Sequence, residues 1–185
     1  MNTKNNQRFK ETEIRMQSAM LELMENTEFR KITVKKICEK AKVNRSTFYA
    51  HFMDIYDMLD KMEQSLRKEL LTSYKSNNEE SYIFSEHSFI LFLEHIKRHK
   101  SFYKVNLQTR KSFPLQQGYE GLWKVIESRC RKVGILDEEE ILYYLISFQA
   151  GFTMALKHWV DTDCKINEKE VAKIIKNCVP NILKV

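Results

Sequence analysis

The sequence predicts an all-α protein, and three observations lead to that fold class. Of its 185 residues only four are Gly and two are Pro, whereas 43% are hydrophobic and 30% are charged, a composition that favours long helices with few turns. Apolar residues recur at helical spacing along most of the chain. Two short amphipathic helices between residues 33 and 52 are separated by a three-residue turn. We therefore expect an N-terminal three-helix domain (residues 1–53) followed by a helical domain (residues 54–185).

The first elements are a polar arm and a helix. Residues 1–8, MNTKNNQR, are polar, and we expect a loose arm there. The helix that follows carries its apolar residues at helical spacing, at Ile14, Met16, Ala19, Met20, Leu23 and Met24. It should lie across the helix pair, with Phe29 and Ile32 of the connection beneath that pair.

The helix pair has a capping residue at each start. Thr33 and Asn44 can each cap the backbone N–H groups of a first turn, which predicts helices from about 34 to 40 and from Arg45 to about Phe52. In the second helix Phe48 and Phe52 face one way, while Arg45 and Tyr49 form a separate stripe. This division is what a helix-turn-helix needs, because its second helix presents its N-terminal residues to base edges in the major groove.

At these residues the chain resembles the TetR family of bacterial transcriptional repressors. The matching positions are Thr33, Ile37, Ala41, Val43, Thr47, Phe48, Tyr49, His51, Phe52, Asp54 and Leu59. Lys42 departs from the usual turn glycine, which costs stability if its φ is positive. Ile55 departs from the usual lysine at the start of the next helix, so a phosphate contact common in the family is expected to be missing.

The charge of the motif agrees with a DNA-binding role. The formal net charge is +6, and between Glu28 and Thr47 seven basic residues stand against two acidic ones. This cluster on the motif is the electrostatic pattern expected of a DNA-binding protein. We expect Arg45 to read guanine, and Ser46 and Thr47 to reach bases. Phosphate contacts are expected from Thr33, Lys35, Tyr49 and His51.

The second domain begins with a long helix capped by Asp54. The resemblance implies that this helix joins the DNA-binding domain to an effector domain. Further helices are expected at about 83–96, 102–107 and from Pro114 to about Val133. Their aromatic residues either line a small-molecule effector pocket or form plain core, and the candidates for the pocket are Phe89, Phe92, Tyr103 and Trp123.

The last two helices are expected at about 138–160 and 167–183. The first is apolar nearly all the way round, with small residues that permit close helix approach, which predicts a two-fold interface with a second copy. The interface candidates are Phe148, Gly151, Phe152, Ala155, Trp159 and Ile175. In the TetR family the last two helices build the dimer in this way, and a dimer implies a palindromic operator.

Other classes of function find little support in the sequence. The four cysteines are scattered without a CxxC pair, no signal peptide is recognised, and no segment is apolar enough to span a membrane, so we expect a cytoplasmic protein. His87, His95 and His99 lack Cys or Asp partners nearby, so no metal and no cofactor is expected. No phosphate-binding loop, nucleophile motif or carboxylate pair indicates an enzyme.

The sequence thus predicts a ligand-responsive repressor that binds a palindromic operator in double-stranded DNA as a homodimer. The alternative is a TetR-like regulator or activator whose C-terminal domain binds a protein partner instead of a small molecule.

Overall fold

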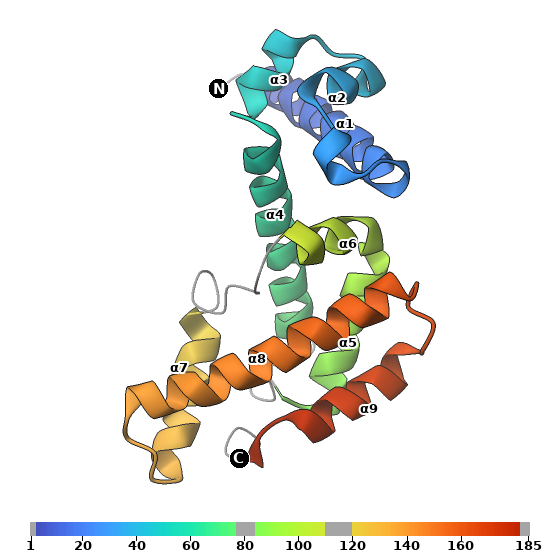
Figure 1. Ribbon diagram of the computed structural model, residues 1–185. Helices are drawn as coiled ribbons and strands as arrows, with labels where there is room; N and C mark the ends of the chain where they lie inside the picture. The colour runs from blue at the N-terminus through green and yellow to red at the C-terminus, as the bar shows by residue number, and fades with distance from the viewer. Residues whose placement is uncertain (1–2, 77–83, 110–119, 182–185) are drawn as a thin grey trace. The chain divides into compact units, whose positions relative to one another are not determined.

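The computed structural model describes residues 3–76, 84–109 and 120–181, and every regular element in these ranges is a helix (Figure 1). The all-α fold class is therefore confirmed. The chain divides into two compact units, Met1–Glu69 and Leu70–Val185.

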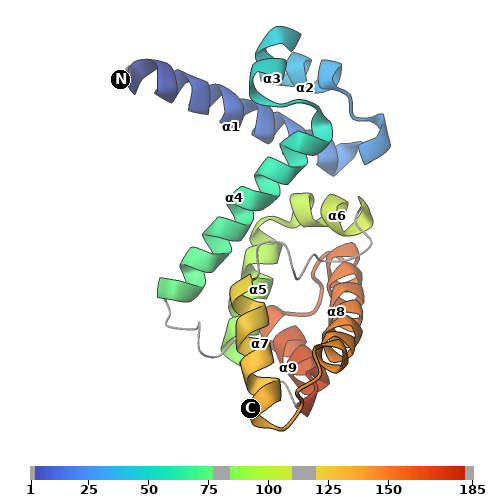
Figure 2. The ribbon, with the colours of Figure 1, turned by 90° about the vertical axis from the view of Figure 1, so that its left-hand side faces the viewer.

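The first unit contains a long helix and the short helix pair. Its elements are α1 (Thr3–Asn26), a 3-10 turn (Phe29–Lys31), α2 (Val34–Ala41), α3 (Arg45–His51) and the greater part of α4 (Ile55–Ser76). Helix α1 packs on α2, and α2 packs on α3 (Figures 1 and 2). The core is made of side chains that are almost fully buried, namely Met16, Met20, Ile37, Phe48, Phe52 and Met58.

The prediction of a loose arm over residues 1–8 is wrong for residues 3–8, because these residues form the first turns of α1. Of these residues Lys4, Gln7 and Arg8 are good helix formers, whereas the Thr and two Asn residues among them are poor ones. Gln7 Nε2 donates to Glu11 Oε1 at 3.1 Å, and Thr12 Oγ1 donates to the carbonyl oxygen of Arg8 at 2.9 Å. Local hydrogen bonds one helical turn apart thus support a helix that the hydrophobic pattern does not show.

Whereas the domain boundary expected from the sequence, 53/54, stays a prediction, the division between the two compact units falls within α4, at 69/70. The reason is that the first turns of α4 belong to the first unit's core. Met58, Leu59 and Met62 are buried, and the Tyr56 ring meets the Phe29 ring edge-on with centroids 5.7 Å apart.

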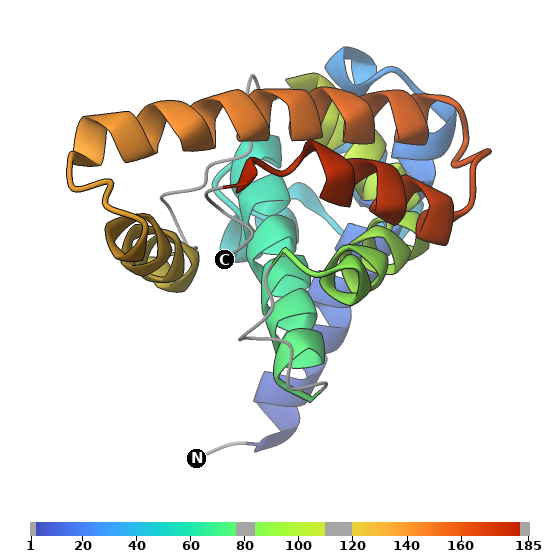
Figure 3. The same ribbon diagram turned by 90° about the horizontal axis from the view of Figure 1, so that it is seen from below.

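The second unit continues with α5 (Glu86–Arg98), α6 (Lys100–Thr109), α7 (Glu120–Lys132), α8 (Glu138–Asp161) and α9 (Glu168–Cys178). Within it α9 packs against α5, and α6 against α8. Helices α8 and α9 run in opposite directions beside each other (Figure 3). The expected start of α7 at Pro114 lies outside the described residues, and α9 ends at Cys178, short of the expected residue 183.

The turn between α8 and α9 is tight. Asp163 and Cys164 both have a left-handed backbone, with φ values of 60° and 55°, and the Cys164 N–H donates to the Trp159 carbonyl at 2.8 Å. The Trp159 indole in turn donates to the carbonyl of Ile166 at 2.7 Å. This turn reverses the chain so that α9 can return along α8.

Among the described helices, none combines the length and the apolar composition that crossing a lipid bilayer requires.

Candidate nucleic-acid interface

The two helices of the predicted motif are capped as the sequence indicates. The Thr33 side chain accepts from the Lys36 N–H at 3.3 Å, and Asn44 Oδ1 accepts from the Thr47 N–H at 2.7 Å. Between them Lys42 has φ 54° and ψ 48°, the left-handed conformation that ends α2. The expected cost of Lys at this position is thus present, because a side chain with a β-carbon is strained there.

Helix α3 has one buried face and one exposed face. Phe48 and Phe52 are 0% and 1% exposed, whereas Tyr49 is 58% exposed and both Arg45 and Ser46 are exposed. With only seven residues, α3 makes two turns, so its packing face fixes which side chains point outward. The outward set contains long and hydroxyl-bearing donors, as major-groove recognition requires.

Asn44 holds two of the predicted base-reading side chains. Its Oδ1 accepts from Ser46 Oγ and from Thr47 Oγ1, both at 2.7 Å, in addition to the Thr47 backbone N–H. The hydroxyls of Ser46 and Thr47 are therefore oriented before any ligand binds.

The basic cluster is partly neutralised. Ion pairs join Lys31 to Glu28 at 3.0 Å, Lys35 to Glu39 at 3.8 Å and Lys40 to Glu22 at 2.6 Å. The pair with Lys31 lowers the pKa of the Glu28 carboxyl. Four cations of the cluster form no ion pair with any residue that the structure describes, namely Arg30, Lys36, Lys42 and Arg45. The positive charge left for a polyanion thus lies at the 3-10 turn, at the start of α2, and at the turn and start of α3.

His51 differs from the other six residues predicted to bind DNA, because it is buried. Its exposed fraction is 9%, its ring stacks on the Phe9 ring with centroids 3.6 Å apart, and its Nδ1 lies 3.7 Å from Glu13 Oε2. The side chain points toward α1 and away from the exposed face of α3. We therefore assign it a packing role and omit it from the proposed contact set.

A groove between α1 and α3 was not predicted from the sequence. It has a volume of about 500 Å³ and is lined by Asn6, Arg8, Phe9, Thr12, Ser46, Thr47, Ala50 and His51. Arg8 thus lines the same groove as Ser46 and Thr47 at the start of α3. The sequence carries little signal for this groove, because residues 3–8, which extend α1, are polar and show no helical spacing of apolar residues.

In the second unit, two of the predicted pocket residues belong to an aromatic cluster. The rings of Phe89 and Phe92 lie 6.0 Å and 5.5 Å from that of Phe152, and Phe148 stacks on Phe152 at 5.7 Å. Phe89 and Phe92 are buried, and Trp123 of α7 is half-buried. Phe152, predicted to lie in a dimer interface, thus contacts the aromatic rings of α5 in the same chain. Phe148, predicted for the same interface, contacts Phe152 and the ring of Phe84, which precedes α5.

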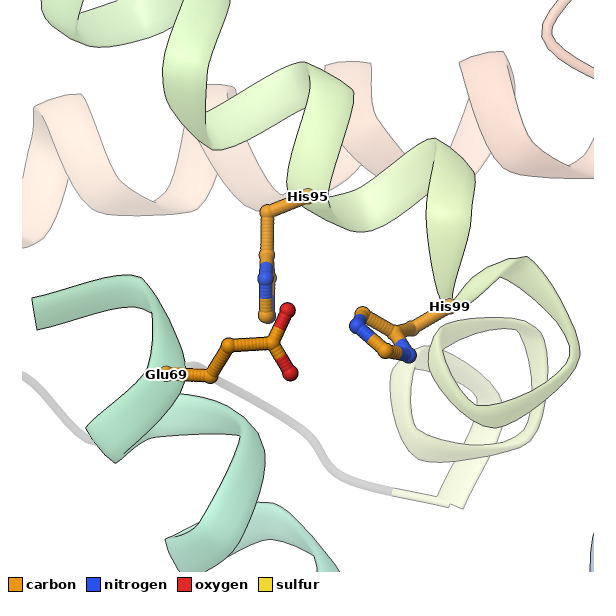
Figure 4. A group of neighbouring side chains, drawn as sticks. All are labelled: Glu69, His95 and His99. Carbon is orange, nitrogen blue, oxygen red and sulfur yellow. The ribbon is translucent and has the colours of Figure 1, made fainter. Parts of the chain in front are cut away.

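The fourth pocket candidate, Tyr103, is buried, and its hydroxyl lies 3.1 Å from His95 Nε2. Figure 4 shows the imidazole of His95 beside that of His99 at the end of α5, with centroids 4.7 Å apart. Glu69, drawn in the same figure, belongs to the first unit. Two imidazoles are fewer ligands than a structural or catalytic zinc site uses, so we propose no metal for this pair.

The remaining interface candidates divide by exposure. Gly151 and Ala155 are exposed, and a β-carbon at Gly151 would meet no atom within 4 Å. Trp159 and Ile175 are buried inside the second unit.

Cys38, Cys130 and Cys164 are also buried, and burial raises the pKa of each thiol, which keeps them protonated and unreactive near neutral pH.

Comparison with known proteins places the chain among regulators. Residues 85–181, just over half of the chain, match a TetR-type family model described as "Transcriptional regulator C-terminal region". A curated relative, the uncharacterized HTH-type transcriptional regulator YxbF of Bacillus subtilis (strain 168), is 28% identical over 97 residues. That stretch is 50% of this chain and 26% of the relative, so the chain spans about a quarter of that protein's length.

A solved structure shares the fold. The dihydroxyacetone kinase operon activator DhaS superimposes with a TM-score of 0.55 at 17% identity, over 94% of this chain and 96% of that one. At this identity the likeness concerns the fold alone.

The helix pair and the two helical units define a regulator of the helix-turn-helix class. The family model makes the assignment specific: the chain belongs to the TetR-type family of transcriptional regulators.

Proposed function

We propose that the protein is a sequence-specific DNA-binding transcriptional regulator that binds a palindromic operator as a homodimer. The observation that carries this proposal is the division of α3 into a buried face, Phe48 and Phe52, and an exposed face with Arg45 at its start. Arg45 is the candidate for bidentate contact with guanine, and Ser46 and Thr47 for further base contacts. Thr33, Lys35 and Tyr49 are the candidates for phosphates.

A homodimer is supported by an exposed apolar stripe on α8. Tyr143, Ala150 and Met154 share one side of the helix, and Tyr143 and Met154 are 65% and 63% exposed. Ile174 on the neighbouring α9 is 57% exposed. Such a stripe is suited to a partner helix, and a two-fold axis through it would bring four helices together. Gly151 and Ala155 flank the stripe and permit a close approach.

Response to a ligand is the second part of the proposal. A small molecule that binds the second unit would release DNA if it has different affinities for the DNA-bound and free states of the dimer. The aromatic cluster of Phe89 and Phe92 is the apolar region for it to enter. We propose that the protein is a repressor located in the cytoplasm. DhaS is by its name an activator. A promoter reporter that carries the selected operator, measured with and without the protein, shows whether transcription falls or rises.

The test is selection of DNA from a random pool by the purified full-length protein. A palindromic winner bound by a dimer, with affinity that falls with rising salt, is the expected result. Sequence-blind, salt-sensitive binding alone would contradict the proposal and would direct attention to the second unit.

A further inference from the structure

The end of α3 is tied to α4 by one ammonium group. Lys61, in the second turn of α4, donates from Nζ to the carbonyl oxygen of His51 at 2.8 Å and to Asp57 Oδ2 at 3.1 Å. The same Nζ lies 5.3 Å from the centroid of the Phe52 ring. His51 is the last residue of α3 and Phe52 is its C-cap, so all three contacts are made at the junction of the two helices.

The junction needs this group because of how α3 ends. The last carbonyls of a helix have no partner within the helix, and their partial negative charge favours a cation. At Phe52 the backbone is extended, with φ −138° and ψ 139°, so the chain leaves α3 without the left-handed turn that often satisfies such carbonyls. Lys61 reaches back from α4 to bind the carbonyl of His51.

Asp57 completes the connection. Its Oδ2 accepts from the Met53 N–H at 2.8 Å as well as from Lys61, and its own N–H donates to Asp54 Oδ1 at 2.8 Å. Met53 and Asp54 lie between the two helices, and both are therefore hydrogen-bonded to Asp57 of α4. A helix of two turns offers few packing contacts of its own, so polar contacts at its end have a large share in setting its direction.

We propose that Lys61 is a positioning residue that fixes the orientation of α3 on α4 and so sets operator affinity without contacting DNA. This inference rests on the proposed DNA-binding function.

The decisive variants are Lys61→Met and Lys61→Arg in the full-length protein. Methionine keeps the aliphatic stem over Phe52 and removes the ammonium, whereas arginine keeps donors for the His51 carbonyl and Asp57. Lys68→Met removes the same charge from the same helix two turns further on and serves as the control. Binding to the selected operator and to an unrelated duplex is measured across a range of salt concentrations.

We expect Lys61→Met to weaken operator binding by about tenfold or more, with the slope of log affinity against log salt unchanged. Binding to the unrelated duplex should change little, Lys61→Arg should restore most of the affinity, and Lys68→Met should behave as the unmodified protein. A slope reduced by about one unit, with equal loss on both duplexes, would show a direct phosphate contact and overturn the inference. Unchanged affinity would overturn it too.

A second measurement needs no DNA. Amide hydrogen exchange at Phe52 and Met53 should be faster in Lys61→Met than in Lys68→Met, while far-UV circular dichroism stays the same. If the unmodified protein selects no DNA sequence, the proposed function fails, yet this measurement still decides whether Lys61 holds the junction. Equal exchange in both variants would contradict the inference by itself.

Discussion

The ring of Phe9 stacks on the ring of His51, with centroids 3.6 Å apart and planes inclined by 22°. This contact joins the second turn of α1 to the last residue of α3. Because Phe9 is 45% exposed, it stabilises the first unit mainly through this one contact. We expect Phe9→Ala to lower the free energy of unfolding by about 0.5–1.5 kcal/mol, measured by urea denaturation. Ile14→Ala, on the same helix and 60% exposed, should change it by less than about 0.5 kcal/mol. Equal effects would show that the ring pair adds nothing.

The left-handed Lys42 predicts a stabilising substitution. Lys42→Gly removes the conflict between the β-carbon and the backbone at φ 54°, and should raise the free energy of unfolding by about 0.5–1 kcal/mol. Chemical denaturation of Lys42→Gly and Lys42→Ala separates this effect from loss of the charge. If alanine stabilises as much as glycine, the backbone conformation is not the cause.

Arg45 and Lys35 should differ in the kind of DNA binding they support. Arg45→Ala is expected to cost about 1–3 kcal/mol at the selected operator and to relax sequence preference, because a base contact is lost. Lys35→Ala should weaken all sequences alike, as loss of a phosphate contact does. Fluorescence anisotropy with operator, single-base variants and unrelated duplex distinguishes the two. Equal losses on all duplexes for both variants would contradict this assignment of roles.

The exposed stripe on α8 predicts a variant that is monomeric. Met154→Glu places a charge at the centre of the proposed interface, where burial without a partner is costly. We expect sedimentation equilibrium at micromolar concentration to show a monomer. Ile14→Glu introduces the same charge at a residue of similar exposure, 60% against 63%, and should leave the dimer intact. A dimer that survives Met154→Glu would place the interface elsewhere.

The junction carboxylate predicts a dependence on pH. The Met53 N–H, followed by Lys61, lowers the pKa of the Asp57 carboxyl below its ordinary value. Its contribution to stability is therefore fully present above the pKa of an unfolded Asp, about 3.9, and is lost as the pH falls through the lower folded pKa. Asp57→Ala should lower stability by about 1 kcal/mol at pH 7, because it removes the acceptor of the Met53 N–H and of Lys61. The free energies of unfolding of Asp57→Ala and of the unmodified protein, measured by denaturation, should converge in acid. A difference that stays constant with pH would exclude the ionised Asp57 carboxylate as the cause.

The sequence was sufficient wherever local chemistry decides the structure. The caps at Thr33 and Asn44 and the buried pair Phe48 and Phe52 follow from residue type and spacing alone, and the structure confirms them. The cost expected of Lys42 depended on a positive φ, and the structure gives this residue a φ of 54°.

Packing between distant segments is what local patterns could not predict. His51 has the spacing of an exposed residue, but the stacking of Phe9 from α1 covers it. Phe148 and Phe152 lie on a helix that is apolar all round, so their spacing does not show which side meets α5. The division of α4 between two units depends on which of its residues are buried, and the helical pattern continues unbroken through that point.

The oxygen of Asn44 has a consequence for the operator's base sequence. Because Ser46 and Thr47 donate their hydroxyl protons to it, each has only lone pairs to offer an incoming base. Arg45 offers only donors. In the hydrogen-bond code of the major groove, donors suit the N7 and O6 of guanine, and acceptors suit the amino groups of cytosine and adenine. Each half of the selected operator should therefore carry a guanine beside a cytosine or adenine whose amino group faces the start of α3. Replacing that base with one that presents a carbonyl at the same place should weaken binding.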